Sequence, residues 1–131
     1  MHIVVPYAAL LALLFVALSI RTLRLRKSLR IAIGDAGDER MLRAMRVHAN
    51  FAEYVPLCIV MLYLVEGQGA PALMIHGLGI ALLLGRLSHA YGVSQPRENY
   101  KFRIFGMVTT FVTLIASSAY LLVAWAGRIG G

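Results

Sequence analysis

The feature that most constrains this chain is a set of four long apolar stretches separated by short polar segments. They lie at about Ile3–Ile20, Val55–Val65, Ala72–Tyr91 and Ile104–Trp125, the second with a polar extension before it. A helix needs roughly 20 residues to cross the hydrocarbon core of a bilayer, and each stretch reaches or approaches that length. Because 60% of the 131 residues are hydrophobic and only 15% are charged, the sequence predicts an integral membrane protein.

We predict a single membrane domain over residues 1–131, folded as an all-α bundle of four transmembrane helices. The expected helices cover about residues 4–24, 39–66, 71–92 and 103–126. Asp38 precedes the second helix as a candidate N-cap, and Pro71 suits the first turn of the third. A soluble four-helix core is disfavoured because the first and last stretches are apolar on every face. A cleaved signal peptide is disfavoured because basic residues follow the first stretch rather than precede it.

Positive charge is concentrated in two of the three connections between the predicted helices. The basic residues are Arg21, Arg24, Arg26, Lys27, Arg30 and Arg40 in the first connection, and Arg97, Lys101 and Arg103 in the third. The second connection, residues 66–70, has neither Lys nor Arg. The positive-inside rule therefore predicts that loops 1 and 3 are cytoplasmic and that both termini face outward. Membrane lipids explain the basic charge, so we expect no nucleic-acid partner.

The second predicted helix carries polar side chains into the membrane. At about 100° per residue, one continuous polar face is formed by Arg46, Asn50, Glu53 and Tyr54, and His48 lies away from it. Ionisable groups at membrane depth pair with one another or line a cavity. One interpretation is an inter-helix ion pair between Arg46 and Glu53. The other is a site for a zwitterionic, carboxylate-rich guest, in which arginines bind carboxylates and Glu53 holds an ammonium group.

A second polar group follows on the third helix and at the start of the fourth. Arg86 and His89 are three residues apart and share a helix face, and Arg103 stands where the fourth helix enters the membrane. An arginine there can contact lipid phosphate and set topology, or it can stabilise a thiolate or oxyanion. The histidines lack the spacing of metal ligands, so no metal site is predicted. The single cysteine, Cys58, lies in an apolar run and is expected to be inert.

Small residues recur every three or four positions on the last two predicted helices. They are Gly77, Ala81, Gly85, Ser88 and Gly92 on the third helix, and Gly106, Thr110, Thr113 and Ser117 on the fourth. Such spacing lets helix backbones approach closely in lipid, so both stripes are interpreted as packing faces.

The order Arg46-Val-His-Ala-Asn50-Phe-Ala-Glu53-Tyr54-Val-Pro56 resembles the second helix of the membrane-associated proteins in eicosanoid and glutathione metabolism, the MAPEG family, with its Arg-x-x-x-Asn-x-x-Glu-x-x-Pro signature. Gly85-Arg86-Leu-Ser-His89 followed by Arg103 resembles the third and fourth helices of that family, especially its prostaglandin E synthase branch. The resemblance covers essentially the whole chain. It implies a homotrimer that binds glutathione, its co-substrate, between neighbouring subunits near the cytoplasmic face.

The resemblance also implies which residues form the site. The implied glutathione contacts are Arg46, His48, Asn50, Glu53 and Tyr54 on the second helix, Arg86 and His89 on the third, and Arg21 or Arg24 at the end of the first. Arg103 matches the arginine that stabilises the glutathione thiolate. Val93 stands where many eukaryotic members have a tyrosine, which changes the surroundings expected for the thiol.

The leading hypothesis is therefore a membrane-bound glutathione transferase or peroxidase that acts on lipophilic electrophiles dissolved in the bilayer. Its expected partners are glutathione, a hydrophobic small molecule or lipid, membrane lipids and copies of itself. Two alternatives stay open. One is a non-catalytic lipid-binding or scaffold protein of the same fold, and the other is a small transporter whose Arg46–Glu53 cluster lies on a solute path.

Overall fold

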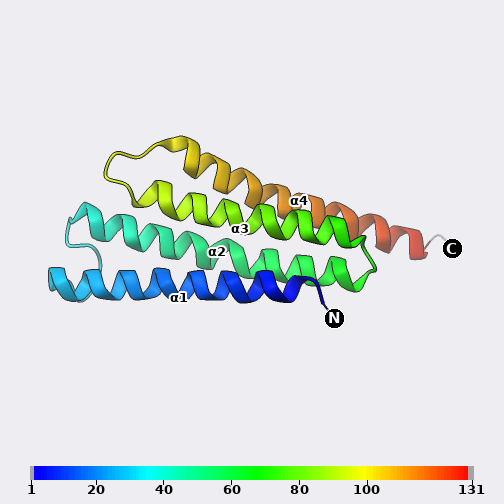
Figure 1. Cartoon of the computed structure of the whole chain (residues 1–131), viewed down its shortest axis with the longest axis horizontal. Helices are drawn as coiled ribbons and strands as arrows, with labels where there is room; N and C mark the ends of the chain where they lie inside the picture. The colour runs from blue at the N-terminus through cyan, green and yellow to red at the C-terminus, as the bar shows by residue number, and fades with distance from the viewer. Residues whose placement is uncertain (1, 130–131) are drawn as a thin grey trace.

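The computed structural model describes residues 2–129 as a bundle of four α-helices (Figure 1). The helices are α1 (Val4–Leu29), α2 (Glu39–Gly67), α3 (Ala72–Ser94) and α4 (Tyr100–Ile129). Each of the four is long and apolar enough to cross a membrane. The predicted all-α, four-span architecture is confirmed, and the chain is a multi-pass integral membrane protein. Residues 1, 130 and 131 lie outside the described part.

The helices run further at the loop 1 and loop 3 end than the sequence predicted. α1 continues past Arg24 to Leu29, and its C-cap is Arg30, whose left-handed backbone (φ 57°) lets the N–H group of the next residue, Ile31, donate to the carbonyl of Arg26 at 3.0 Å. α3 continues to Ser94, and α4 begins at Tyr100. Hydropathy marks where a helix leaves the hydrocarbon, whereas the backbone hydrogen bonds continue into the basic segments beyond it.

The connections are closed by caps of different kinds. Asp38 is the N-cap of α2, as predicted, and its carboxylate accepts from the backbone N–H groups of Arg40 (2.9 Å) and Met41 (3.1 Å). The Arg40 guanidinium and the Met41 N–H group hold the pKa of Asp38 at about 2, below its usual 3.8. Pro71 is the N-cap of α3 rather than a residue of its first turn.

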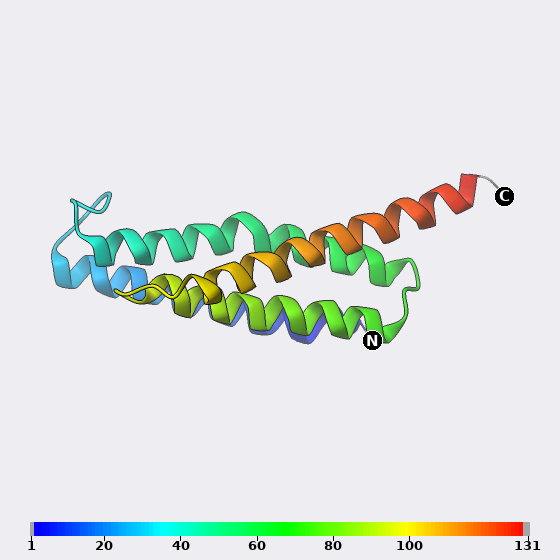
Figure 2. The same cartoon turned by 90° about the horizontal axis from the view of Figure 1, so that it is seen from above.

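The four helices alternate in direction, so that two of them start at each end of the bundle (Figures 1 and 2). α1 packs on α2 and α3, and α4 packs on the same two helices from another side. Within residues 2–129, α1 and α4 do not touch each other. We call the end where α1 and α3 finish and α2 and α4 begin the basic end; both termini lie at the opposite end.

Glycines on the predicted packing stripes bring α3 and α4 into close contact. A Cβ atom on Gly106 would lie 2.5 Å from the carbonyl oxygen of Gly85 and 2.5 Å from Cβ of His89. A Cβ on Gly92 would lie 3.2 Å from the backbone nitrogen of Arg103. Gly77 is an exception to the predicted stripe, because a Cβ there would meet nothing within 4 Å. The contact between α3 and α4, which we call the α3–α4 seam, therefore requires glycine only in its part near the basic end.

Gly106→Val is expected to destabilise the bundle by about 1–3 kcal/mol, because the new side chain would overlap the α3 backbone. Gly77→Val places the same side chain in the open space beside α3 and is the matched control. The measurement is thermal unfolding of both variants in one detergent. Equal melting temperatures for the two variants would show that the seam does not depend on close approach.

Candidate functional site

The polar face predicted on α2 separates into exposed and inward-facing residues. Arg46 and Glu53 are exposed, whereas Asn50 and Tyr54 are half-buried, and the Tyr54 ring packs edge-on against Phe111 of α4 at 5.8 Å between centroids. Across residues 2–129, neither Arg46 nor Glu53 takes part in an ion pair. The first interpretation, an Arg46–Glu53 pair, is therefore wrong for the single subunit. Arg46 and Glu53 are therefore two charged side chains on a membrane span whose charges need a partner from outside the subunit.

Beneath this face lies a buried cluster centred on Arg86 of α3. Its side chain is 1% exposed, and its Nη2 group donates to Oδ1 of Asn50 at 2.7 Å. The hydroxyl of Thr110 accepts from Nη1 at 3.4 Å, and Nδ1 of His89 lies 3.4 Å from Nη2. The guanidinium carbon also stacks over the ring of Phe51, 5.6 Å from its centroid. The cluster is held by neutral acceptors and an aromatic face, with no carboxylate bonded to Arg86 among the described residues.

This contact fixes how Asn50 is presented. Arginine can only donate, so the amide oxygen of Asn50 must face Arg86, and its amide nitrogen must point elsewhere. That nitrogen makes no side-chain hydrogen bond in the described part of the chain, which leaves it as a donor toward the α2 surface. The Nε group of Arg86 is buried and also lacks a bond among residues 2–129. Asn50 therefore depends on Arg86 for its orientation, and Arg86 depends on Asn50 for its closest acceptor.

His48 belongs to a different contact from the rest of the α2 residues. Its Nε2 atom lies 3.0 Å from the hydroxyl of Ser19 on α1, and its ring stacks on Phe15 at 4.8 Å between centroids. This confirms the expectation that His48 points away from the polar face of α2, since it contacts α1. Its predicted role as a glutathione contact stays a prediction.

Arg103 lies at the exposed start of α4, beside a carboxylate that sequence reasoning missed. Its guanidinium is 3.6 Å from Glu98, whose side chain is only 8% exposed although it lies in the α3–α4 loop. Glu98 also accepts from Arg43 of α2 at 3.1 Å, and Arg43 pairs with Glu39 at 2.8 Å. The pair between Glu39 and Arg43 can be predicted from their spacing of four residues on a helix. The position of Glu98 cannot be predicted in this way, because it lies in a loop. This chain of charges joins the starts of α2 and α4.

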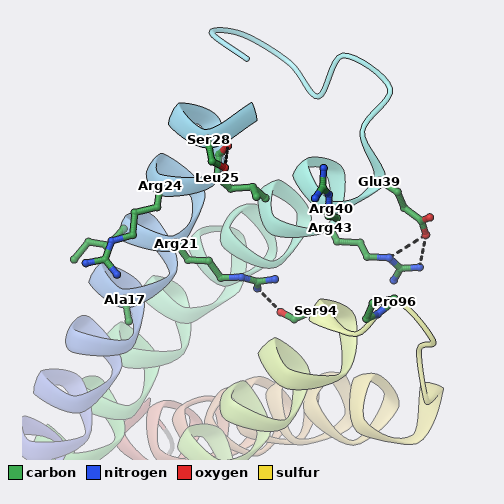
Figure 3. Close-up of a pocket in the computed structure, with 11 residues that line it drawn as sticks. Ala17, Arg21, Arg24, Leu25, Ser28, Glu39, Arg40, Arg43, Ser94 and Pro96 are labelled. Carbon is green, nitrogen blue, oxygen red and sulfur yellow. Dashed lines mark hydrogen bonds and ion pairs between the residues drawn. The ribbon is translucent and has the colours of Figure 1, made fainter. Parts of the chain in front are cut away.

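The two α1 arginines that the sequence singled out line a cavity at the basic end (Figure 3). Its volume is about 860 Å³, and α1, the start of α2 and the end of α3 form its walls. Arg21 reaches into the cavity and donates to the hydroxyl of Ser94, whereas Arg24 extends to the other side of α1 (Figure 3). Neither Arg46 nor Glu53 lines this cavity.

The predicted site residues thus occupy separate places in one subunit. Arg46 and Glu53 form an open outer face, Asn50, Arg86 and His89 lie inside the bundle, and Arg21 and Arg24 lie at the cavity. The described residues contain no group of three or more His, Cys, Asp or Glu side chains placed to hold a metal ion.

The protein is a membrane protein of four spanning helices. Asn50 of α2 and Arg86 of α3 form a polar contact between two of these helices. The sequence model of the MAPEG family matches residues 4–123. Inner membrane protein YecN, from two strains of Escherichia coli, is 40% identical over 109 residues, which cover 83% of this chain and 82% of YecN. The chain therefore belongs to the MAPEG family, and the resemblance noted from its sequence is confirmed.

Proposed function

We propose that this protein is a membrane-bound glutathione transferase or peroxidase for lipophilic electrophiles. The observation that carries the proposal is the pair of charges, Arg46 and Glu53, exposed on a membrane span above the buried Asn50–Arg86 contact. A charge at membrane depth is stable only when a partner or ligand compensates it. Glutathione offers two carboxylates and one ammonium group, which complement these charges. Membership of a family that includes glutathione transferases supports the same assignment.

Each residue then has a distinct role. Glu53 accepts from the ammonium group of glutathione, Arg46 binds a carboxylate in a paired hydrogen bond, and the amide nitrogen of Asn50 donates to the peptide. Tyr54 lies beside Asn50 and Glu53 on the same helix face. The burial of Arg86 and His89 favours a supporting role for them, because Arg86 bonds to the amide oxygen of Asn50 and His89 lies beside Arg86.

The open face needs a second wall, which a homotrimer would supply from the neighbouring subunit. Arg24 is the α1 residue better placed to reach such a neighbour, because its side chain extends to the side of α1 away from Arg21 (Figure 3). Glutathione would then be enclosed between α2 of one subunit and α1 of the next. A site from which water is excluded has a lower dielectric constant, so the charge–charge contacts inside it are stronger.

Arg103 would supply the chemistry by favouring the thiolate, which is the nucleophile. In the transferase reaction, the thiolate sulfur forms a bond to the electrophilic carbon, and the leaving group departs with the electron pair of the broken bond. In the peroxidase reaction, the sulfur attacks the distal oxygen of a hydroperoxide, the O–O bond breaks, and the alkoxide leaves and takes up a proton to become an alcohol. The sulfenic acid so formed reacts with a second glutathione to give the disulfide and water. The apolar substrate would enter sideways from the bilayer.

The experiment pairs a charge variant with a charge-deleted ligand. Glu53→Gln is expected to weaken glutathione binding about 10-fold, the usual scale for a charge-assisted hydrogen bond. An analogue of glutathione that lacks the α-amino group should bind the wild type and Glu53→Gln equally. Titration calorimetry on the purified protein measures both. A loss of the same size for both ligands would remove Glu53 from the ammonium contact.

The same preparation separates the alternative functions. Conjugation of an aryl halide, or reduction of a lipid hydroperoxide, identifies an enzyme. Glutathione binding without either product identifies a non-catalytic member of the fold. Uptake of a solute by reconstituted vesicles, with no conjugate formed, identifies a transporter.

A further inference from the structure

The cavity at the basic end has a charge distribution that the glutathione proposal does not use. Its volume of about 860 Å³ lies in the range of pockets that hold small organic ligands. Four arginines and one carboxylate contribute to its lining: Arg21, Arg24, Arg40, Arg43 and Glu39. A cavity with this lining favours an anion.

Two of these four arginines are already neutralised. Arg40 pairs with Asp38 at 2.8 Å, and Arg43 pairs with Glu39 at 2.8 Å and with Glu98 at 3.1 Å. Arg21 and Arg24 are different, because no carboxylate pairs with either among residues 2–129. The one side-chain bond of Arg21 there is to the hydroxyl of Ser94, whereas Arg24 extends to the other side of α1 (Figure 3). Figure 3 shows the guanidinium of Arg21 directed across the cavity from α1 toward α3. Two positive charges of the lining therefore lack a carboxylate partner in the described residues, and that of Arg21 is the one directed across the cavity.

The walls become apolar with depth. α1 contributes Ser28 nearest the helix end, Arg21 further in, and Ile20 and Ala17 beyond it. At 1.5 Å per residue, Ala17 lies roughly 16 Å deeper along α1 than Ser28. Polar groups at the membrane surface and an apolar wall below them follow the profile of a phospholipid, whose phosphodiester lies above its acyl chain.

We infer that this cavity binds an anionic phospholipid, with its phosphodiester on Arg21 and one acyl chain along Ile20 and Ala17. A phosphodiester carries one negative charge, which the unpaired guanidinium of Arg21 can neutralise. The surplus of arginines over carboxylates disfavours a headgroup with its own ammonium, so phosphatidylglycerol is preferred over phosphatidylcholine. Inorganic phosphate has the charge but no chain to bury against the apolar wall. The bound lipid would join the end of α1 to the end of α3.

The test is lipid binding by the purified full-length protein, measured by native mass spectrometry. Phosphatidylglycerol is expected to bind the wild type in preference to phosphatidylcholine, and Arg21→Ala should weaken it at least about 5-fold. Lys27→Ala removes an exposed α1 charge that does not line the cavity and is the matched control. Ala17→Phe fills the apolar depth with Arg21 intact and should also weaken binding, so the result does not depend on one variant folding.

Several outcomes would overturn the inference. Equal binding of the two phospholipids, or an equal loss in Lys27→Ala, would reduce the effect to general attraction by basic loops. Displacement of the lipid by inorganic phosphate at matched concentration would make the cavity a free-anion site. Displacement by glutathione would assign the cavity to the co-substrate. Because glutathione binding is measured separately through Glu53→Gln, failure of either proposal leaves the other standing.

Discussion

Arg103→Ala is expected to abolish the thiolate absorbance of bound glutathione and to lower kcat/KM for an aryl halide about 100-fold or more. The reason is electrostatic, because a guanidinium beside the sulfur favours the anion over the neutral thiol. Without it, the thiol pKa should return toward the value of about 8.5 for a free thiol. Removing one donor that stabilises a developing anion costs enzymes a factor of this order.

The control for this prediction is Arg97→Ala, which removes an exposed basic residue from the same loop region. It should leave both the absorbance and the rate unchanged, since a general loss of positive charge at the basic end is not the cause. Ultraviolet titration of the glutathione complex across pH gives the thiol pKa of each variant. A wild-type complex with no thiolate absorbance at neutral pH, or an unchanged absorbance in Arg103→Ala, would contradict the assignment of Arg103.

The ion pair between Arg103 and Glu98 affects how this experiment should be interpreted. At 3.6 Å, Glu98 partly neutralises Arg103 in the subunit without ligand, and it is itself held by Arg43. A thiolate must therefore compete with a carboxylate for the same guanidinium. Because of this competition, we expect Arg103 to lower the pKa of the bound glutathione thiol only modestly in the wild type. The thiol should therefore be partly, not completely, ionised at neutral pH.

The fold was predictable because its determinants are local. The length of the apolar stretches sets the four spans, and the N-cap at Asp38 fixes the start of α2. The expected bounds of α1 and α4 were approximate, and both helices run a few residues beyond them, to Leu29 and from Tyr100, because apolar length does not report helix that continues in water. Close packing at Gly106 was predictable from spacing, but the inclusion of Gly77 was wrong, since spacing does not say where two crossing helices diverge.

The candidate site was less predictable, because its geometry depends on which helix fills each side of α2. Helical periodicity placed Arg46, Asn50 and Glu53 on one face but could not show that Asn50 turns inward to Arg86. It also gave no information on Glu98, which lies in a loop and becomes buried only when α2 and α4 meet. Contacts between residues distant in sequence require the packed bundle.

The inward turn of Asn50 leads to the second large effect. Asn50→Ala is expected to destabilise the subunit by about 2 kcal/mol even without glutathione. Its amide oxygen is the closest acceptor of the Arg86 guanidinium, at 2.7 Å, and Arg86 is 1% exposed. Loss of that acceptor would leave a buried charge with the long contacts to Thr110 and His89 and the face of the Phe51 ring. A buried polar group without its partner costs more than the bond contributed.

A double-mutant cycle separates this structural role from a role in binding. Arg86→Leu removes the charge that needs the acceptor, so Asn50→Ala combined with Arg86→Leu should be more stable than Asn50→Ala alone. Reversible unfolding in mixed micelles measures the four free energies of unfolding. Additive losses would mean that the two side chains act independently, and Asn50 would then serve the ligand alone. A coupled result would show that Asn50 and Arg86 stabilise the bundle as a pair. Any effect of Arg86 on glutathione would then pass through the orientation of Asn50, because the Arg86 side chain is only 1% exposed.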